Sequence, residues 1–310
     1  MSFKKQIKQF VPDKLWTQVR KQLILREQKR VGKICDKLIG DYYAGKLVHF
    51  PIHPKKQFAN ERIIWQYWGQ GFENMPKIVR ICLKSVECHK GDYQLVRITD
   101  SDLADYVDFP EEIYQKRAAF SKAHFSDLLR CVLLSTYGGV WLDATLLLTG
   151  PLPEKYFTQG FFMFQRDDKE THQINWEKNF VHYWGWYKGF KVKVFNSLIY
   201  SERGNQVIVS LCDMLYNFWL KEQSLPHYFF FQILFNELME KYPQLNCPIV
   251  NDCLPHYATQ TILDNFLSIS FHDALELSTV HKASYKMNEA DIAQLKKLLI
   301  EEGKYPLILR

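Results

Sequence analysis

The spacing of apolar and polar residues along the chain predicts strands and helices in alternation. Residues 62–68, RIIWQYW, form an aromatic and β-branched run that stops at a glycine, which is typical of a buried strand. Residues 75–90 repeat apolar side chains at helical spacing around Pro76, and residues 93–100, YQLVRITD, return to a strand pattern. This alternation indicates an α/β fold with a mostly parallel, mixed sheet covered by helices.

A second helix and strand surround an aspartate in an apolar setting. Residues 121–137 carry an apolar stripe at helical spacing, Ser121 can cap this helix, and the following glycine pair can end it. Residues 140–148, VWLDATLLL, then predict one strand that contains Asp143. A buried carboxylate without a partner is costly, so Asp143 is expected to hold another group.

The rest of the chain predicts fewer elements and a division into three parts. The elements expected after residue 150 are a strand at 160–168, helices from about Gln206 and within 226–242, and a short strand and turn within 274–286. The parts are a helical arm, 1–46, a main domain, 60–290, and a C-terminal tail, 291–310.

The net charge of +6 is concentrated in the arm. Residues 1–46 contain 12 lysines and arginines against 4 acids, whereas the rest of the chain contains 28 against 30. One face of the expected helix begins apolar and becomes basic: Leu15, Val19, Leu23, Arg26 and Arg30. This pattern favours either binding of residues 1–40 to an anionic membrane or docking of the apolar stripe on the main domain. No nucleic-acid-binding motif accompanies the arm, so nucleic acid is not an expected partner.

The cysteines and the hydropathy point to the cytoplasm. Seven cysteines occur without a CxxC pair, which favours reduced thiols over a zinc site or a disulfide framework. No apolar run approaches the roughly 20 residues that span a bilayer, and the N-terminus lacks the apolar core of a signal peptide. We therefore expect a cytoplasmic protein, or one that is peripheral on the inner face of the cell membrane.

The predicted helix and the strand after it carry the candidate chemistry. Asp127 and Arg130 are three residues apart and share a helix face. The turn that follows should bring Asp143 to the same point, so that two carboxylates and a guanidinium converge. Carboxylates accept hydrogen bonds from ribose or sugar hydroxyls and can bind a divalent metal ion, while arginine binds diphosphate. The set suits a nucleotide sugar. The alternative is an exposed ion pair of little energetic weight.

The run AHFSDLLRCVLLSTYGGVWLDAT, residues 123–145, resembles a known motif. It is similar to the DxxR…GG-x-[YW]-x-D-x-D block of glycosyltransferases with a DXD sugar-binding region. It resembles most the capsular polysaccharide synthesis proteins related to glycosyltransferase family 32. IIWQYWGQGFENMPKIVRICLKSV, HYFFFQILF and VHKASYK are similar to further blocks of that family, and the resemblance covers roughly residues 60–290.

The resemblance implies a GT-A-like nucleotide-sugar-binding fold and an enzyme of the hexosyltransferase type. Its donor would be a nucleoside diphosphate sugar, expected to be a UDP-sugar, and transfer would proceed with retention. The acceptor would be a glycan, expected to be a lipid-linked capsular or exopolysaccharide precursor. The cofactor would be a divalent metal ion, Mn²⁺ or Mg²⁺. An inverting enzyme, with Asp167 or Asp168 as the base, is the alternative mechanism.

The resemblance also implies residue roles in the donor site. Asp127 and Arg130 would contact the donor, and Gly139 belongs to the same donor-binding block. Trp68 would stack on the nucleotide base, because an aromatic ring offers a π-face. Asp100 ends a strand, and it either contacts the base or ribose or is only a turn residue.

The metal site implied by the resemblance contains one departure from the motif. Asp143 would be the first acid of DXD, with Arg130 beside it for catalysis and His281 as a further ligand. Thr145 stands where the second acid is expected, and a hydroxyl is a weak neutral ligand. This departure motivates the alternative function, a degenerate transferase fold that binds nucleotide sugar or glycan without turnover.

Overall fold

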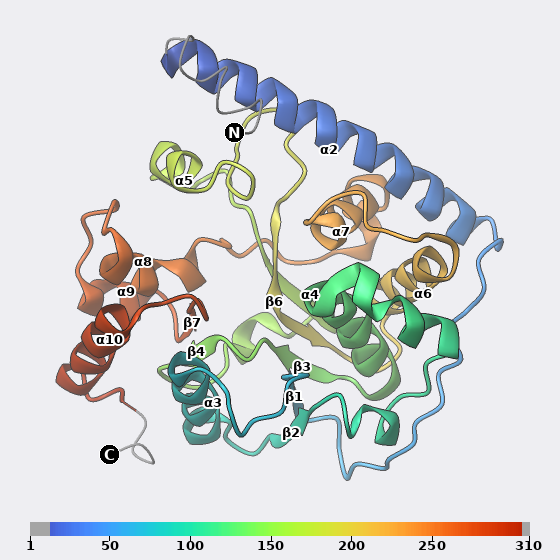
Figure 1. The fold of residues 1–310 in the computed structure, drawn as a ribbon, viewed down its shortest axis with the longest axis horizontal. Helices are drawn as coiled ribbons and strands as arrows, with labels where there is room; N and C mark the ends of the chain where they lie inside the picture. The colour runs from blue at the N-terminus through green and yellow to red at the C-terminus, as the bar shows by residue number, and fades with distance from the viewer. Residues whose placement is uncertain (1–12, 306–310) are drawn as a thin grey trace.

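The computed structural model describes residues 13–305 and confirms an α/β fold built on a mixed sheet covered by helices (Figure 1). In sheet order the strands are β2 (Gln94–Ile98), β1 (Ile63–Tyr67), β3 (Gly139–Leu142), β6 (Val194–Ser201) and β5 (Phe161–Gln165). β2, β1 and β3 pair in parallel, and β6 is antiparallel to both β3 and β5. Since β6 alone runs in the opposite direction, the sheet is mostly parallel, as the pattern predicts.

Alternate residues of the central strands supply two hydrophobic clusters. Trp65 of β1 and Trp141 of β3 belong to the larger cluster, to which the long helices contribute. Those helices are α2 (Asp13–Tyr43), α4 (Glu111–Tyr137), α6 (Gln206–Lys221) and α7 (Phe230–Lys241). Ile64 and Val140 point the other way and join Val86 of α3 (Lys77–His89) in the second cluster. Burial on both faces explains why these strands are almost entirely apolar.

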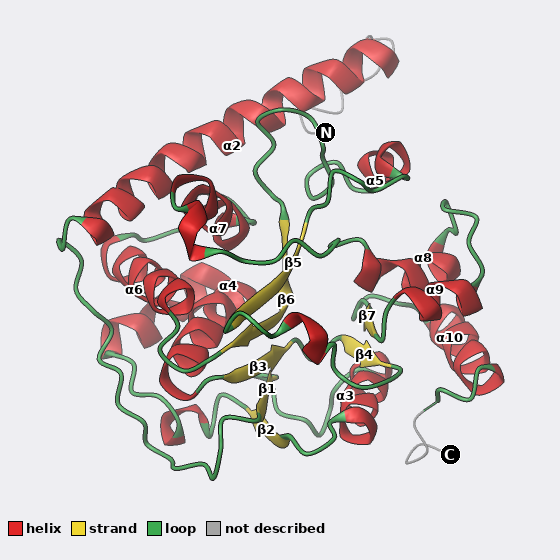
Figure 2. Ribbon diagram, turned by 180° about the vertical axis from the view of Figure 1, so that it is seen from behind, coloured by secondary structure: helices red, strands yellow, loops and turns green. Residues whose placement is uncertain are grey.

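A second, two-stranded sheet lies beside α3. It pairs β4 (Leu146–Leu148) antiparallel with β7 (Val280–Lys282). The C-terminal helices gather next to it, as Figure 2 shows from behind; they are α8 (Tyr257–Leu263), α9 (Phe271–Leu277) and α10 (Glu289–Glu301). The remaining short elements are α5 (Gln173–Asn179) and the 3₁₀ turns η1 (Leu103–Asp105), η2 (Glu154–Tyr156), η3 (Pro243–Leu245) and η4 (Leu254–His256).

Helix α2 uses two faces for two purposes. The inner face is fully or nearly buried and packs along α7 and α6 (Figure 1); it comprises Ile24, Gln28, Val31, Cys35 and Ile39. The outer stripe is exposed and changes from apolar to basic: Leu15, Val19, Leu23, Arg26, Lys29, Lys33 and Lys37. The arm therefore docks on the main domain through its other face, and the expected docking of the apolar stripe is wrong. The predicted stripe of Leu15, Val19, Leu23, Arg26 and Arg30 remains exposed. The first twelve residues of the arm lie outside the described residues. Neither α2 nor any other helix between residues 13 and 305 is both long and apolar enough to cross a membrane.

The predicted single strand over residues 140–148 is wrong. The chain forms β3, turns at Asp143, and continues as β4 in the other sheet. The turn closes through hydrogen bonds from the Asp143 amide to the Ser197 carbonyl, 2.9 Å, and from the Leu146 amide to the Asp143 carbonyl, 2.9 Å. The two short apolar runs pack in different sheets, so Asp143 lies in the connection and not inside a strand.

Two further expectations are corrected near the site. Helix α4 consists of two helical segments that meet at a kink at Ser121, where φ is 66° and ψ is 158°, so the helix expected from Ser121 does start there, but Ser121 does not cap it. This backbone is not the extended one of an N-cap residue, and the hydroxyl instead bonds His124 Nδ1 at 2.8 Å. Strand β6 is absent from the predicted elements, because Asn196 and Ser197 interrupt its apolar pattern.

Candidate functional site

A cleft of about 830 Å³ opens beyond the carboxyl ends of β1 and β3, which is the edge where open α/β sheets bind ligands. The lining residues that carry the polar chemistry are Asp127, Arg130, Asp143, Thr145 and Lys282, with Trp68 beside them. Further aromatic side chains surround this polar floor: Trp141, Phe180, Tyr183, Trp184, Phe195 and Tyr228. Rings around a few convergent polar groups are typical of a small-molecule site.

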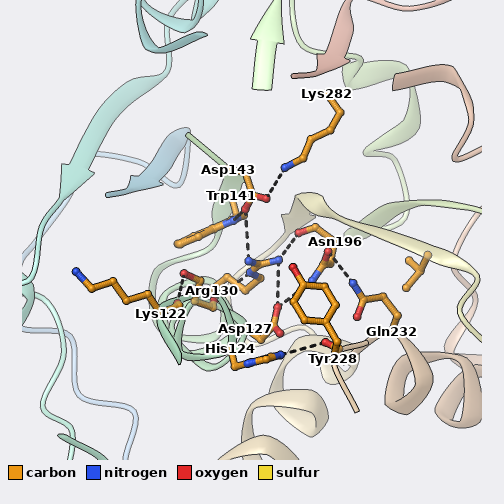
Figure 3. Close-up of polar contacts among 12 residues, drawn as sticks. Lys122, His124, Asp127, Arg130, Trp141, Asp143, Asn196, Tyr228, Gln232 and Lys282 are labelled. Carbon is orange, nitrogen blue, oxygen red and sulfur yellow. Dashed lines mark hydrogen bonds and ion pairs between the residues drawn. The ribbon is translucent and has the colours of Figure 1, made fainter. Parts of the chain in front are cut away.

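Arg130 joins the two carboxylates that the sequence predicts to converge (Figure 3). Its side chain lies 3.4 Å from Asp127 Oδ1 and 3.4 Å from Asp143 Oδ1, and only 4% of the residue is exposed. The guanidinium also donates to the carbonyls of Ser126, 3.0 Å, and Asn196, 2.6 Å. These contacts hold Arg130 between α4 and β6, so it sets the positions of both acids.

Asp143 binds a second cation, supplied by the far end of the chain (Figure 3). Lys282 Nζ donates to Asp143 Oδ2 at 3.0 Å and to Thr145 Oγ1 at 2.9 Å. The Trp141 indole donates to Asp143 Oδ1 at 2.9 Å. Both carboxylate oxygens of Asp143 and the hydroxyl of Thr145 are therefore engaged by donors of the protein.

The environment drives the pKa values of the two acids in opposite directions. Burial alone would raise the pKa of Asp143, but the charges of Lys282 and Arg130 outweigh it and lower that pKa to about 2. Burial raises the pKa of Asp127 to about 6, helped by the negative charge of Asp143 and opposed by Arg130 and His124. Asp143 is thus ionised at neutral pH and well below it, whereas Asp127 titrates near pH 6.

Replacing Asp127 with asparagine should change how stability depends on pH. A carboxyl group whose pKa rises from 3.8 to about 6 on folding stabilises the fold below pH 3.8, and this contribution is lost as the pH rises through 6. Between acid and neutral pH, the parent should therefore lose about 2 to 3 kcal/mol of unfolding free energy that the Asp127→Asn variant does not lose. Denaturant titrations at several pH values measure it. If the free energy of unfolding depends on pH in the same way for both proteins, the raised pKa of Asp127 is contradicted. The control is Asp168→Asn, which removes an exposed acid.

Trp68 lines the cleft, and Asp100 lies outside it. Trp68 directly follows β1, half-buried, where its ring can contact a ligand. Asp100 pairs with Arg117 and accepts a hydrogen bond from the Tyr67 hydroxyl, and it is not among the lining residues. The structure thus brings Trp68, but not Asp100, into the cleft.

Gly139 and His281 are not brought to the turn at Asp143. Gly139 starts β3, at the opposite end from Asp143, where φ is 99° and a Cβ would collide with the Ile63 carbonyl oxygen. Close packing of β3 against β1 explains the glycine. His281 is fully buried, its Nε2 bonds Thr149 Oγ1 at 2.9 Å, and burial lowers its pKa to about 3. It points to the opposite side of β7 from Lys282, because neighbouring residues of a strand alternate.

The residues at the turn do not fit the divalent metal ion that the resemblance implies. No group of three or more metal-binding side chains occurs among residues 13–305. Asp143 offers one carboxylate and Thr145 one hydroxyl, and the ammonium of Lys282 occupies the space between them. Mn²⁺ and Mg²⁺ prefer several oxygen ligands and are repelled by a neighbouring cation.

Several cleft residues are missing from the site that the sequence predicts. Asn196 donates to Asp127 Oδ1 at 2.8 Å and accepts from Gln232 at 3.1 Å, which extends the polar floor to α7 (Figure 3). His256 Nε2 and Gln260 Oε1 are buried atoms of lining residues, without a hydrogen-bond partner in the described part of the chain. The polar pair Asn196-Ser197 within an apolar run is the sequence signal that indicates Asn196 as a site residue. Gln232, His256 and Gln260 reach the cleft only through tertiary contacts.

Comparisons with known proteins show what the chain is similar to. Residues 15–301 match the model of a family described as Capsular polysaccharide synthesis protein. The O-glycosyltransferase PaGT of Phomopsis amygdali is 24% identical over 164 residues, which are 42% of this chain and only 40% of PaGT. The solved structure of the PaToxG glycosyltransferase aligns with a TM-score of 0.39 and 14% identity, over 93% of this chain and 97% of that one.

Proposed function

The chain belongs to the capsular polysaccharide synthesis protein family, and on this premise we propose that it is a glycosyltransferase that moves a hexose from a nucleoside diphosphate sugar to a glycan. One observation carries the proposal: Asp127, Arg130 and Asp143 converge with Lys282 in an aromatic-lined cleft at the ends of parallel strands. Carboxylates bind sugar hydroxyls, cations bind a diphosphate, and an aromatic ring stacks on a base. A UDP-sugar is the donor that the family resemblance favours.

The proposed chemistry breaks the bond between the anomeric carbon and the diphosphate oxygen. The acceptor hydroxyl oxygen forms the new bond to that carbon, and its proton passes to the departing diphosphate. Lys282 neutralises the charge that develops on the leaving group. Asp143 and Asp127 hold donor hydroxyls, and Arg130 keeps both carboxylates in position and balances their charge.

Retention of the anomeric configuration is proposed over inversion, because inversion needs a carboxylate base and the described lining has no carboxylate that is free of Arg130. Asp127 and Asp143 are the acids of that lining, and both are engaged with Arg130. Asp167 and Asp168, the acids considered for inversion, do not line the cleft. The anomeric configuration of the product, read by NMR, distinguishes the two mechanisms.

A donor screen tests the proposed function. A nucleotide sugar present at about 100 times its Kd should stabilise the protein by about 2.7 kcal/mol and raise its Tm by several degrees. The same donor should release its sugar to water or to an added glycan. Free hexoses and nucleoside monophosphates are the controls. Binding without release or transfer would favour the alternative that Thr145 motivates, a protein that holds nucleotide sugar without turnover. Failure of every nucleotide sugar to bind would reject both.

The acceptor is proposed to be a lipid-linked capsular or exopolysaccharide precursor, reached by a protein that binds the inner face of the membrane. The outer stripe of α2 supports this proposal. Its basic residues Arg26, Lys29 and Lys33 are exposed on the same stripe as the apolar residues Leu15 and Leu23. An amphipathic helix of this kind binds anionic lipid through both charge and apolar burial.

Neutralising three basic residues of this stripe should weaken binding to anionic vesicles by roughly 100-fold, at about 1 kcal/mol for each residue near the surface. The variant is Arg26→Gln with Lys29→Gln and Lys33→Gln, and sedimentation with phosphatidylglycerol vesicles measures it. Donor turnover in solution should not change, because none of the three residues lines the cleft. The matched control replaces three lysines near the C-terminus, Lys296, Lys297 and Lys304, with glutamine. Equal sedimentation of both variants and the parent would reject the membrane proposal.

A further inference from the structure

Lys282 occupies the position between the two side chains that an acid-x-acid motif would use to bind a metal ion. Its Nζ lies 3.0 Å from Asp143 Oδ2 and 2.9 Å from Thr145 Oγ1. These side chains stand at the first and third positions of D-A-T. The contact joins residues 139 positions apart in the chain, so it is a product of the fold and not of local sequence.

The pairing of β4 with β7 directs Lys282 to this position. Leu146 pairs with Lys282 and Leu147 with His281, and the Ala283 amide donates to the Thr145 carbonyl at 3.0 Å. This register extends β7 alongside the turn. The side chain of Lys282 stays 25% exposed, on the cleft side, while the side chain of His281 is buried on the other side. An ammonium has three donors, so two bonds to the turn leave one for a ligand in the cleft.

The charges at the turn balance in the same way as those of a metal site. Two carboxylates with a divalent metal ion have no net charge, and one carboxylate with a lysine ammonium also has none. A neutral Thr145 at the position of the second acid and the single positive charge of Lys282 therefore balance the one carboxylate of Asp143. An acid at position 145 alone, or loss of the ammonium alone, would leave the turn with an unbalanced charge in a largely buried setting.

We propose that the Lys282 ammonium, held by Asp143 and Thr145, performs the role of the divalent cation, so that the donor diphosphate is bound and released without metal. This inference rests on the proposed transferase function and concerns the same site. Lys282 contacts a diphosphate oxygen directly and stabilises the negative charge that develops as the bond to the sugar breaks. A preorganised cation of this kind contributes on the order of 100-fold to the rate.

The experiment compares metal dependence in the parent and two variants. Binding of UDP by calorimetry and turnover of the donor found in the screen are measured in EDTA and in Mn²⁺. The parent should perform equally in both. Lys282→Met should lose about 100-fold in turnover in either condition. The double variant Thr145→Asp with Lys282→Ala should be inactive in EDTA and regain activity in Mn²⁺, since it restores two acids and frees the space between them. Lys297→Met, at an exposed lysine of α10, is the control.

The outcomes separate this inference from the proposed function. A parent protein that binds and turns over the donor only with Mn²⁺ would overturn the role of Lys282 and leave the transferase function standing. A parent that neither binds UDP nor turns over any nucleotide sugar would overturn both. A Lys282→Met variant that folds normally and works as fast as the parent would also reject the role of Lys282.

Discussion

Replacing Asp143 with asparagine should lower donor turnover by about 100-fold or more while leaving the fold intact. The amide keeps the shape of the side chain and can still accept the hydrogen bond from the Trp141 indole. It loses the negative charge that Lys282 and Arg130 share, so both cations lose their common partner. Loss of one preorganised charged contact at a reacting centre has an effect of this size. Initial rates with the donor from the screen measure it.

Two further variants make the Asp143 result specific. Asp143→Glu keeps the charge but displaces it by one methylene, so it should retain more activity than the asparagine variant and less than the parent. Asp168→Asn removes an exposed acid outside the cleft lining and should leave the rate unchanged. Circular dichroism confirms folding of each protein. An asparagine variant as fast as the parent would show that the site is assigned to the wrong residues.

Replacing Arg166 with methionine should destabilise the protein by about 3 to 5 kcal/mol, because it leaves a buried carboxylate unpaired. Arg166 makes two hydrogen bonds to Asp252, 2.9 and 3.0 Å, and the side chains are only 1% and 0% exposed. The guanidinium also lies 4.6 Å from the ring centres of both Trp184 and Trp186, whose rings are nearly parallel, and donates to the Tyr183 carbonyl. Denaturant unfolding measures the loss.

The same substitution should weaken donor or acceptor binding, since Tyr183 and Trp184 line the cleft. The double variant Arg166→Met with Asp252→Leu removes both charges and should recover part of the lost stability, because a buried pair can be replaced by apolar residues at little cost. If the single variant stays within about 1 kcal/mol of the parent, the Arg166–Asp252 pair does not anchor the segment that carries Tyr183 and Trp184. If the double variant is less stable than the single one, the unpaired charge is not the cause.

Apolar spacing predicts a helix or strand correctly where the residues that begin and end the element lie within it or directly beside it. Residues 62–68 contain β1, and the helix expected from Gln206 begins at that residue, where Asn205 accepts a hydrogen bond from the Val207 amide. The family resemblance drawn from residues 123–145 is confirmed by the family model, which covers residues 15–301. Apolar spacing and caps act over a few residues, so they can be read from the sequence.

Patterns fail where the partner of an element is distant in the chain. The run 140–148 has the pattern of one strand, yet its halves pair with β6 and β7, which are far away in the sequence. The resemblance places Gly139 in a donor site, whereas in the structure this glycine allows β3 to approach β1 closely. The split of residues 140–148 and the role of Gly139 both depend on which strands pair and in which register. Neither can be read from residues 139–148 alone.

The sequence by itself determined that Asp127, Arg130 and Asp143 would meet, because helical spacing and a glycine turn bring together residues that are close in the chain. It also identified Thr145 as the departure from the motif. Only the tertiary structure decided which cation pairs with the second carboxylate oxygen of Asp143. The register of β4 against β7 directs Lys282 to the turn and His281 away from it, because successive side chains of a strand point to opposite sides.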